Sequence, residues 1–176
     1  MEIYRYAASS ERAGHASRHR VAVFCPNTVD PDRLTAFRFS FKSRSGPLAS
    51  AIQAFFDQAS YAVVGASRQR HKFGNQVLRL YQRLGWTVLP INPHAEEVEG
   101  LPCVSELQDL EEVPDAISVI TPPHVTTSVV REAIRLGIRH IWLQPGAESP
   151  EAVADCRAAG IDLIWGGPCI LVDAPA

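Results

Sequence analysis

The sequence predicts an α/β protein with an open, mainly parallel sheet and helices on both faces. Two observations predict it. From about residue 60 onward, short apolar and β-branched runs alternate with stretches of helical periodicity. Small residues or prolines follow most of the apolar runs, as expected where strands end. Such βαβ alternation is typical of parallel sheets, because each crossover helix covers a face of the sheet.

Each element follows from the local pattern. Strands are predicted at residues 61–64, 87–91, 116–120, 138–143 and 161–164, and helices at 48–59, 75–84, 105–110, 125–136 and 151–159. Asn75 and Ser105 are suitable N-cap residues, and Gly137 and Gly160 are suitable helix terminators. Residues 96–104 are predicted to leave the sheet, with a turn at Glu99-Gly100 and a short strand near Cys103.

The N-terminal region differs from the rest. Residues 1–48 are rich in Arg, Ser and His, and they are expected to be a poorly ordered extension or a mitochondrial presequence. A third interpretation is a packed element, because Phe37, Phe39 and Phe41 alternate with polar residues as in an edge strand. Residues 49–176 are expected to form the binding domain. Cytoplasm is the default location, and a mitochondrial location depends on the leader.

Composition narrows the function classes. The chain of 176 residues is 46% hydrophobic and 20% charged, with a net charge of −2. It has no run of about 18 apolar residues, so we expect no membrane partner, and the charge does not favour a nucleic-acid partner. Cys25, Cys103, Cys156 and Cys169 are widely spaced, which argues against a zinc knuckle or disulfide framework and favours a reducing compartment.

The first strand leads into a turn of small residues, Gly65, Ala66 and Ser67. A phosphate group can approach backbone N–H groups in such a turn. Arg68, Arg70 and Lys72 follow at every second position and can neutralise its charge. The turn lacks the G-x-G-x-x-G fingerprint of dinucleotide sites, so a plain strand-to-helix connection is the alternative interpretation.

Turns of similar character follow four predicted strands. In open parallel sheets, ligands bind beyond the carboxyl ends of the strands, near the point where the strand order reverses. The residues at these ends are Gly65-Ala66-Ser67, Asn92-Pro93-His94, Thr121-Pro122-Pro123 and Gln144-Pro145-Gly146. Each turn alone is explained by the tendency of Pro and Gly to end strands. Together they predict a ligand site along one edge of the sheet.

The end of the second strand bears on the ligand. Nicotinamide dinucleotide sites place an Asp or Glu there to bind the ribose hydroxyls, and this chain has Asn92. NAD(P) is therefore the less favoured cofactor. The basic residues after Gly65 suit a ligand with several phosphates, such as coenzyme A (CoA) with its pyrophosphate and 3′-phosphate.

Seven segments resemble a known family. They are VVGAS at 63–67, KFGNQVLRLY at 72–81, VLPINP at 88–93, VEGLPC at 98–103, ITPP at 120–123, IWLQPG at 141–146 and GGPCILV at 166–172. The region 55–172 resembles a stand-alone CoA-binding domain, related to the N-terminal domain of the succinyl-CoA synthetase α subunit, and it looks closest to fungal members.

The resemblance implies a Rossmann-type fold that holds the ADP part of CoA or an acyl-CoA. It implies that Gly65, Ala66 and Ser67 contact the pyrophosphate and that Lys72 supplies charge. Asn92 and Pro93 would line the nucleotide, Thr121 and Pro122 would lie beside the adenosine, and Gln144 and Gly146 would form the far rim. This chain departs from the pattern at His94, where related domains often carry a basic residue.

The residues show no catalytic constellation. His71, His94, His124 and His140 are scattered, and no Ser-His-Asp order or metal-ligand set is present. Cys169 carries one hypothesis, a mixed disulfide with the CoA thiol under oxidation, against the alternative of a buried and inert thiol. Three functions stay open. They are a small CoA-binding or sensing module, an NAD(P)-dependent oxidoreductase, and an interaction scaffold that uses a nucleotide fold.

Overall fold

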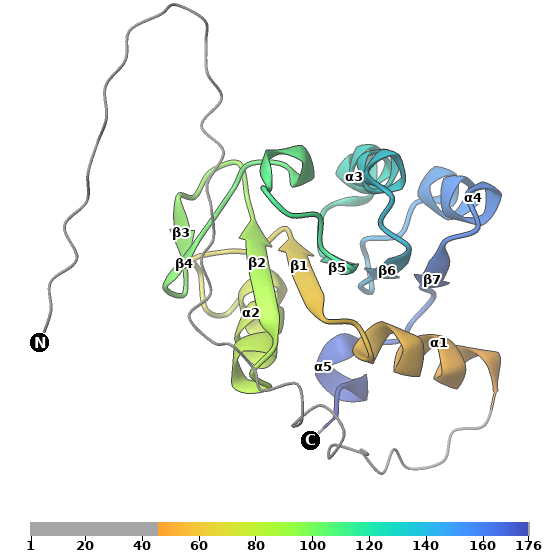
Figure 1. Cartoon of the computed structure of the whole chain (residues 1–176), viewed down its shortest axis with the longest axis horizontal. Coiled ribbons are helices and arrows are strands. Elements are labelled where there is room, and N and C mark those ends of the chain that lie inside the picture. Colours follow the sequence, from red (N-terminus) through yellow and green to blue (C-terminus); the bar gives the residue numbers. More distant parts are fainter. Residues whose placement is uncertain (1–45, 176) are drawn as a thin grey trace, which may run out of the picture.

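A five-stranded parallel sheet forms the centre of the structure, a computed structural model that describes residues 46–175 (Figure 1). Its strands are β1 (Ser60–Val64), β2 (Thr87–Ile91), β5 (Ala116–Val119), β6 (His140–Leu143) and β7 (Asp162–Ile164). They lie in the order β2-β1-β5-β6-β7, and every neighbouring pair is parallel. The predicted fold class is confirmed. The predictions for residues 1–45 lie outside the described residues.

Helices cover both faces of this sheet (Figure 1). One face carries α1 (Pro47–Phe56), α2 (Phe73–Arg83) and α5 (Ile170–Asp173), and the other carries α3 (Pro123–Leu136), α4 (Pro150–Ala158) and a 3₁₀ turn, η2 (Leu107–Asp109). Beyond β2, the short strands β3 (Glu97–Val98) and β4 (Leu101–Pro102) form an antiparallel hairpin. No helix within residues 46–175 is long and apolar enough to cross a bilayer.

The core has two halves because side chains alternate across each strand. In β1, Ala62 and Val64 pack toward α3 and α4, whereas Tyr61 and Val63 pack toward α1 and α2. The second half is rich in aromatic rings. Phe55 and Trp142, for example, meet edge to face with ring centroids 5.3 Å apart. Strands buried on both faces explain why the sequence shows continuous apolar runs instead of period-2 alternation.

Helix ends show where local signals were misleading. Helix α2 begins at Phe73 with Lys72 as N-cap, so the prediction of Asn75 as the cap is wrong. The segment after Ser105 is only a 3₁₀ turn, and Glu106 caps it through a reciprocal pair with Asp109, so the prediction of Ser105 as the cap is also wrong. The end of α3 at Gly137, which has φ 83°, is confirmed.

Candidate functional site

The order of the strands reverses between β1 and β5. The chain leaves β1 for β2 on one side and later returns to β5 on the other side. The four predicted turns follow β2, β1, β5 and β6, which are adjacent strands. Because parallel strands share one carboxyl edge, the structure brings these turns together around the topological switch point. This is where doubly wound sheets bind ligands.

Two glycines build the turn after β1. Gly65 has φ 91°, and a Cβ atom there would lie 2.9 Å from the carbonyl oxygen of Ile120. A Cβ atom on Gly74 would lie 2.0 Å from the carbonyl oxygen of Gly65. The first turn of α2 therefore packs directly against the end of β1. These are the tasks that glycines perform in dinucleotide-binding turns, although the spacing here is longer.

The backbone donors of this turn are only partly available to a ligand. The N–H groups of Gly65 and Ala66 both donate to the carbonyl oxygen of Ile91, at 3.0 and 3.2 Å. These two amides are therefore engaged within the protein, and the contact of Gly65, Ala66 and Ser67 with a pyrophosphate stays a prediction. Within residues 46–175, the N–H groups of Ser67 and of Phe73, at the start of α2, have no protein acceptor. They are two of the N–H groups in this segment that are open to a ligand.

Asn92 ties the end of β2 to the same turn. Its Nδ2 donates to the carbonyl oxygen of Ala66, and its Oδ1 accepts the N–H of His94 at 2.8 Å. Its own N–H donates to the carbonyl oxygen of Val104 at 2.9 Å. The side chain at the position where NAD sites carry a carboxylate is thus an amide. Both of its polar atoms form hydrogen bonds with backbone groups.

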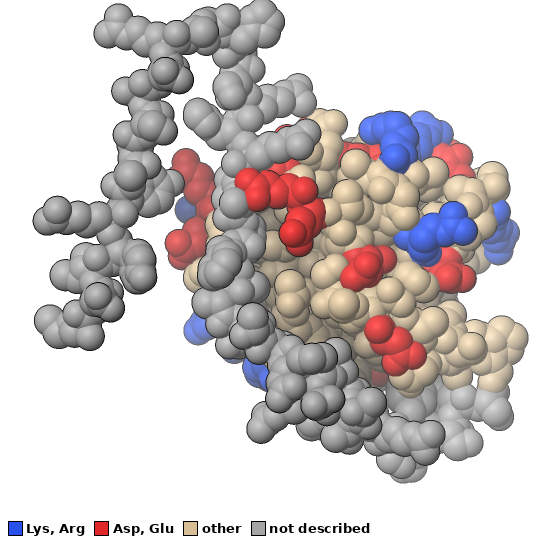
Figure 2. Space-filling model, viewed as in Figure 1, with Lys and Arg blue, Asp and Glu red and all other residues tan. Residues whose placement is uncertain are grey.

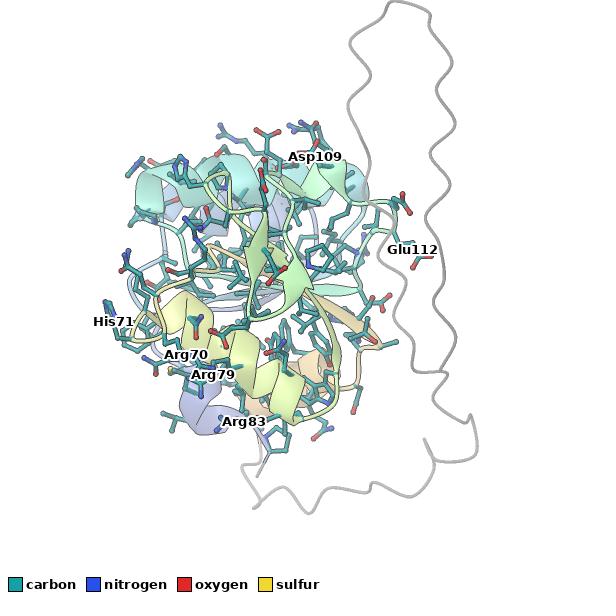
Figure 3. The ribbon with its side chains drawn as sticks, turned by 90° about the vertical axis from the view of Figure 1, so that its left-hand side faces the viewer. Arg70, His71, Arg79, Arg83, Asp109 and Glu112 are labelled. Carbon is teal, nitrogen blue, oxygen red and sulfur yellow. The ribbon has the colours of Figure 1, made fainter. Side chains whose placement is uncertain are left out.

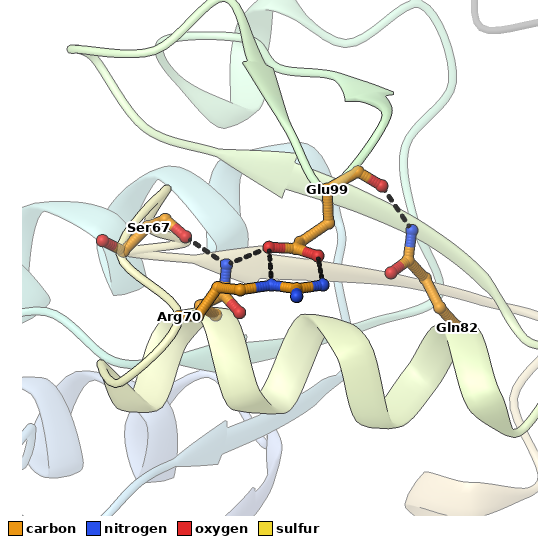
Figure 4. A network of polar contacts seen from close by, with 5 residues as sticks. Ser67, Arg70, Gln82 and Glu99 are labelled. Atoms are coloured by element: carbon orange, nitrogen blue, oxygen red, sulfur yellow. Dashed lines mark hydrogen bonds and ion pairs between the residues drawn. The ribbon is translucent and has the colours of Figure 1, made fainter.

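A network around Glu99 fixes the loop after the glycine turn (Figure 4). Arg70 donates to both carboxylate oxygens of Glu99, at 3.1 and 2.7 Å. Asn75 donates to Glu99 Oε1 at 2.9 Å and to the carbonyl oxygen of Ser67 at 2.7 Å. Gln82 donates to the carbonyl oxygen of Glu99 at 3.0 Å. We call these contacts the Glu99 clasp.

The clasp holds a residue with unusual backbone geometry. Glu99 has φ 49° and Gly100 has φ 81°, the pair of positive angles that a two-residue hairpin between β3 and β4 requires. The side chain of Glu99 is 15% exposed and that of Arg70 is 67% exposed. The hydrogen bonds from Arg70 and Asn75 lower the pKa of Glu99 to about 2. The clasp therefore remains charged at neutral pH.

The clasp changes the role expected of Arg70. Figure 3 shows Arg70 and His71 beside the start of α2, and Arg79 and Arg83 along that helix. Arg70 is committed to Glu99, so the expectation that it neutralises ligand phosphate is not supported. Among the described residues, Arg68 and Lys72 are exposed and have no ion-pair partner.

A cavity of about 350 Å³ opens beside the switch point, between η2 and α3. The predicted site residues Gly65, Pro93 and Thr121 line it. The remaining lining residues are apolar toward the sheet and polar toward solvent: Val64, Ile91, Ser105, Glu106, Leu107, Gln108, Val125, Ser128, Val129, Glu132 and Arg135. We call it the α3 cavity.

A second cavity, of about 970 Å³, lies beside the first and shares Pro93 and Ser105 with it. Its other lining residues come from the loop after β1 and from the segment around the β3–β4 hairpin: Arg68, His94, Ala95, Glu96, Glu97, Pro102 and Cys103. We call it the β2 cavity, because its residues surround the segment that follows β2.

The other predicted residues lie around the same edge, outside the linings of these cavities. Lys72 and Pro122 are the N-cap residues of α2 and α3. Gln144 is only 4% exposed, its Oε1 accepts the N–H of Ile170 at 3.1 Å, and its Nε2 has no partner among the described residues. The N–H of Gly146 donates to Glu148 Oε2 at 2.7 Å.

Several lining residues were missed from the sequence. Val125, Val129, Glu132 and Arg135 come from one face of α3, and their spacing of three or four residues was the available signal. The segment 105–108 gave no signal, because its role depends on packing across from α3.

The scattered histidines form no centre. His124 is exposed in the first turn of α3, and His140 Nδ1 lies 3.5 Å from Asp162 Oδ2. Among the described residues, no group of three His, Cys, Asp or Glu side chains is arranged to hold a metal ion. Cys169 is partly exposed at the N-cap of α5, and its disulfide chemistry stays a hypothesis. Mass spectrometry after treatment with CoA disulfide tests it.

The face seen in Figure 2 carries basic side chains gathered over α3 and α4, interrupted by acidic ones. These two helices are joined by an ion pair between Arg131 of α3 and Asp155 of α4, at 2.7 Å.

Comparison with known proteins identifies the family. The CoA binding domain family matches residues 59–175. The chain belongs to this family. A solved structure of a conserved hypothetical protein from Pyrococcus furiosus shares 38% identity with a TM-score of 0.62, covering 65% of this chain and 98% of that one. The predicted closeness to fungal members stays a prediction.

Longer relatives contain a similar domain. An ADP-forming acetate–CoA ligase of Methanocaldococcus jannaschii is 28% identical over 80 residues, which cover 46% of this chain and 11% of the ligase. The dinucleotide-forming acetyl-coenzyme A synthetase 1 of Ca. Korarchaeum cryptofilum is 27% identical with a TM-score of 0.53, covering 62% of this chain and 26% of that one. The region matched by this chain spans only about a tenth of the Methanocaldococcus jannaschii ligase.

A shorter bacterial relative, the uncharacterized protein YneT of Bacillus subtilis, is 26% identical over 103 residues, which cover 58% of this chain and 76% of that protein. Similar domains thus occur both in proteins not much longer than a domain and in large ligases.

Proposed function

We propose that this chain binds CoA or an acyl-CoA through its ADP moiety and acts as a small binding or sensing module. Membership of the CoA binding domain family supports CoA as the ligand. The observation that carries the proposal is the α3 cavity, which opens at the topological switch point and is lined by Gly65, Pro93 and Thr121.

The α3 cavity would hold the adenosine. Val125 and Val129 of α3 and Leu107 of η2 supply apolar walls, between which a flat base would be held. Pro93 and Thr121 lie at the strand ends on either side of Gly65. In this arrangement Thr121 and Pro122 are next to the adenosine, and Asn92 positions Pro93 through its backbone contacts.

The pyrophosphate would lie over the turn formed by Gly65, Ala66 and Ser67. Gly65 and Gly74 keep this backbone free of side chains. The open N–H groups of Ser67 and Phe73 are donors for phosphate oxygens, and the start of α2, an eleven-residue helix, favours an anion. Lys72, exposed at the N-cap of α2, supplies the balancing charge.

The remaining part of CoA would pass over the ends of β5 and β6. Gln144 and Gly146 follow β6, two strands away from β1, so they form the far rim of the site. The Nε2 of Gln144, which is buried and has no partner among the described residues, lies beneath this rim.

The oxidoreductase alternative has less support. Asn92 offers no carboxylate to the ribose hydroxyls of NAD, and both polar atoms of its side chain are engaged with backbone. A scaffold that binds no nucleotide is the third possibility, and it is distinguished by the same experiment.

A substitution that fills the α3 cavity tests the proposal. Ser128 is exposed and lines the cavity, whereas Ala154 is exposed on α4 and lines neither cavity. In calorimetric titrations of the full chain, Ser128→Trp is expected to weaken CoA binding at least about tenfold, and Ala154→Trp is expected to leave it unchanged. Equal affinity of both variants would contradict the assigned site, and the absence of any nucleotide binding would favour the scaffold.

A further inference from the structure

We propose that Glu132 recognises the base of the ligand by accepting a hydrogen bond from the 6-amino group of adenine in the α3 cavity. This contact depends on the proposed binding of the adenosine in that cavity. It gives a specificity-determining role to a side chain of α3 that was not among the site residues predicted from the sequence.

A hydrogen bond between η2 and α3 orients this carboxylate. The backbone N–H of Gln108, in η2, donates to Glu132 Oε1 at 2.9 Å. Both residues line the α3 cavity, so the bond joins its two walls. Within residues 46–175, the second oxygen, Oε2, accepts no hydrogen bond. One oxygen of the carboxylate is therefore used by the protein, and the other is available to a ligand.

The half-buried position of Glu132 makes a further donor favourable. Burial raises the pKa of its carboxyl group, and the hydrogen bond from the N–H of Gln108 opposes this change. A charge that is partly removed from water is stabilised by each hydrogen bond that it accepts. A ligand N–H group on Oε2 would therefore offset part of the desolvation of this carboxylate.

Glu106, the other acidic residue that lines the cavity, is already engaged. Its carboxylate accepts hydrogen bonds from Gln108 Nε2 and from the backbone N–H of Asp109. Glu106 is also exposed, whereas Glu132 is partly buried. Of the two carboxylates, that of Glu132 is the one with an open oxygen on the wall of the cavity.

Ser128 adds a second acceptor on the same wall. It lines the cavity one turn before Glu132, and residues four apart lie side by side on a helix. The Ser128 hydroxyl donates to the carbonyl oxygen of Val125 at 2.7 Å, so toward a ligand it acts as an acceptor. Two acceptors on adjacent turns suit the 6-amino group of adenine, which carries two N–H donors.

The direction of α3 places Glu132 far from the phosphates. The helix begins at Pro123, beside the carboxyl edge of the sheet, and Glu132 is nine residues further along, about 14 Å at 1.5 Å per residue. In an adenosine nucleotide the 6-amino group lies on the edge of the base that is remote from the ribose. With the pyrophosphate over Gly65, this edge would point along α3 toward Glu132.

An analogue of CoA that carries unsubstituted purine in place of adenine tests the contact, because it lacks only the 6-amino group. In calorimetric titrations of the full wild-type chain, its dissociation constant is expected to be at least about ten times that of CoA. In Glu132→Gln this ratio should fall toward one. The amide keeps an oxygen for the N–H of Gln108 but presents N–H donors to the 6-amino group.

Glu106→Gln is the matched control, because it removes the same charge from the same cavity at a side chain that is already engaged. Its ratio is expected to remain that of the wild type, even if both affinities change. Since Glu132→Gln retains the bond to Gln108, we expect both variants to fold, which thermal unfolding checks.

Equal binding of CoA and the purine analogue to the wild type would overturn this inference and leave the proposed function standing. A wild-type ratio in Glu132→Gln, or an equal fall of the ratio in both variants, would also overturn it. If neither ligand binds, both proposals fail.

Discussion

The carbonyl oxygen of Gly65 lies only 2.0 Å from the position that a Cβ atom on Gly74 would occupy. The start of α2 therefore contacts the turn after β1 backbone to backbone. This contact exposes the first N–H groups of α2 next to the open amide of Ser67, and it depends on the absence of one side chain.

We expect Gly74→Ala to push α2 away from β1, because the atom that the new Cβ meets is backbone and cannot rotate away. The free energy of unfolding, measured with urea, should fall by at least about 2 kcal/mol. Gly85→Ala is the comparison. A Cβ atom at Gly85 would meet open space, but the backbone there has φ 73°. The loss of unfolding free energy in this variant should therefore be smaller, about 1 kcal/mol, which is the cost of a positive φ for a residue with a Cβ atom. Wild-type stability of Gly74→Ala would contradict the packing described here.

The Glu99 clasp predicts a pH dependence. The pKa of Glu99 is lowered from 4.5 to about 2 by Arg70 and Asn75, so the stabilisation is complete above about pH 5 and is lost as the pH falls toward 2. Glu99→Gln should be less stable than the wild type at pH 7, and the difference should disappear near pH 2. Glu111→Gln, a change at an exposed acid, should show no such trend. A difference that is constant across this pH range would argue against the clasp.

Two buried hydroxyl groups meet between α2 and β5 of the sheet. Tyr81 OH and Ser118 Oγ are 2.7 Å apart, and both side chains are fully buried. We expect Tyr81→Phe to destabilise the protein by about 1–3 kcal/mol, because it leaves the Ser118 hydroxyl without its partner. The double variant Tyr81→Phe, Ser118→Ala should cost less than the two single changes together. Additive costs in denaturant unfolding would show that the two groups do not interact.

Asn92→Asp separates a structural role from cofactor choice. The carboxylate would face the carbonyl oxygen of Ala66 in place of the amide donor, so we expect a loss of about 1–3 kcal/mol in unfolding free energy. We expect no gain of NAD binding, which calorimetry checks. A stable variant that binds NAD would mean that residue 92 selects the cofactor rather than holding the turn.

The sequence predicted the five parallel strands well, because strands buried on both faces leave continuous apolar runs such as 116–120. It missed α5, which has only four residues and so shows no helical period. The misassigned cap at Asn75 has a tertiary cause: its amide donates to Ser67 and Glu99 instead of capping the helix.

For the site, the sequence identified the strand ends but not the groups that are free to bind. The amides of Gly65 and Ala66 look available in the sequence, yet the carbonyl of Ile91 on the next strand occupies both. Arg70 looks like a phosphate ligand until the hairpin brings Glu99, 29 residues later, onto its guanidinium group. Such pairings depend on how distant segments meet, which local patterns do not contain.

The central claim is that the chain binds CoA by its ADP moiety. The most direct measurement is calorimetric titration of the full 176-residue chain with CoA and, in parallel, with NAD. We predict saturable binding of CoA and at least about tenfold weaker binding of NAD. Binding of NAD with no response to CoA would contradict the account and point to a dehydrogenase-type site.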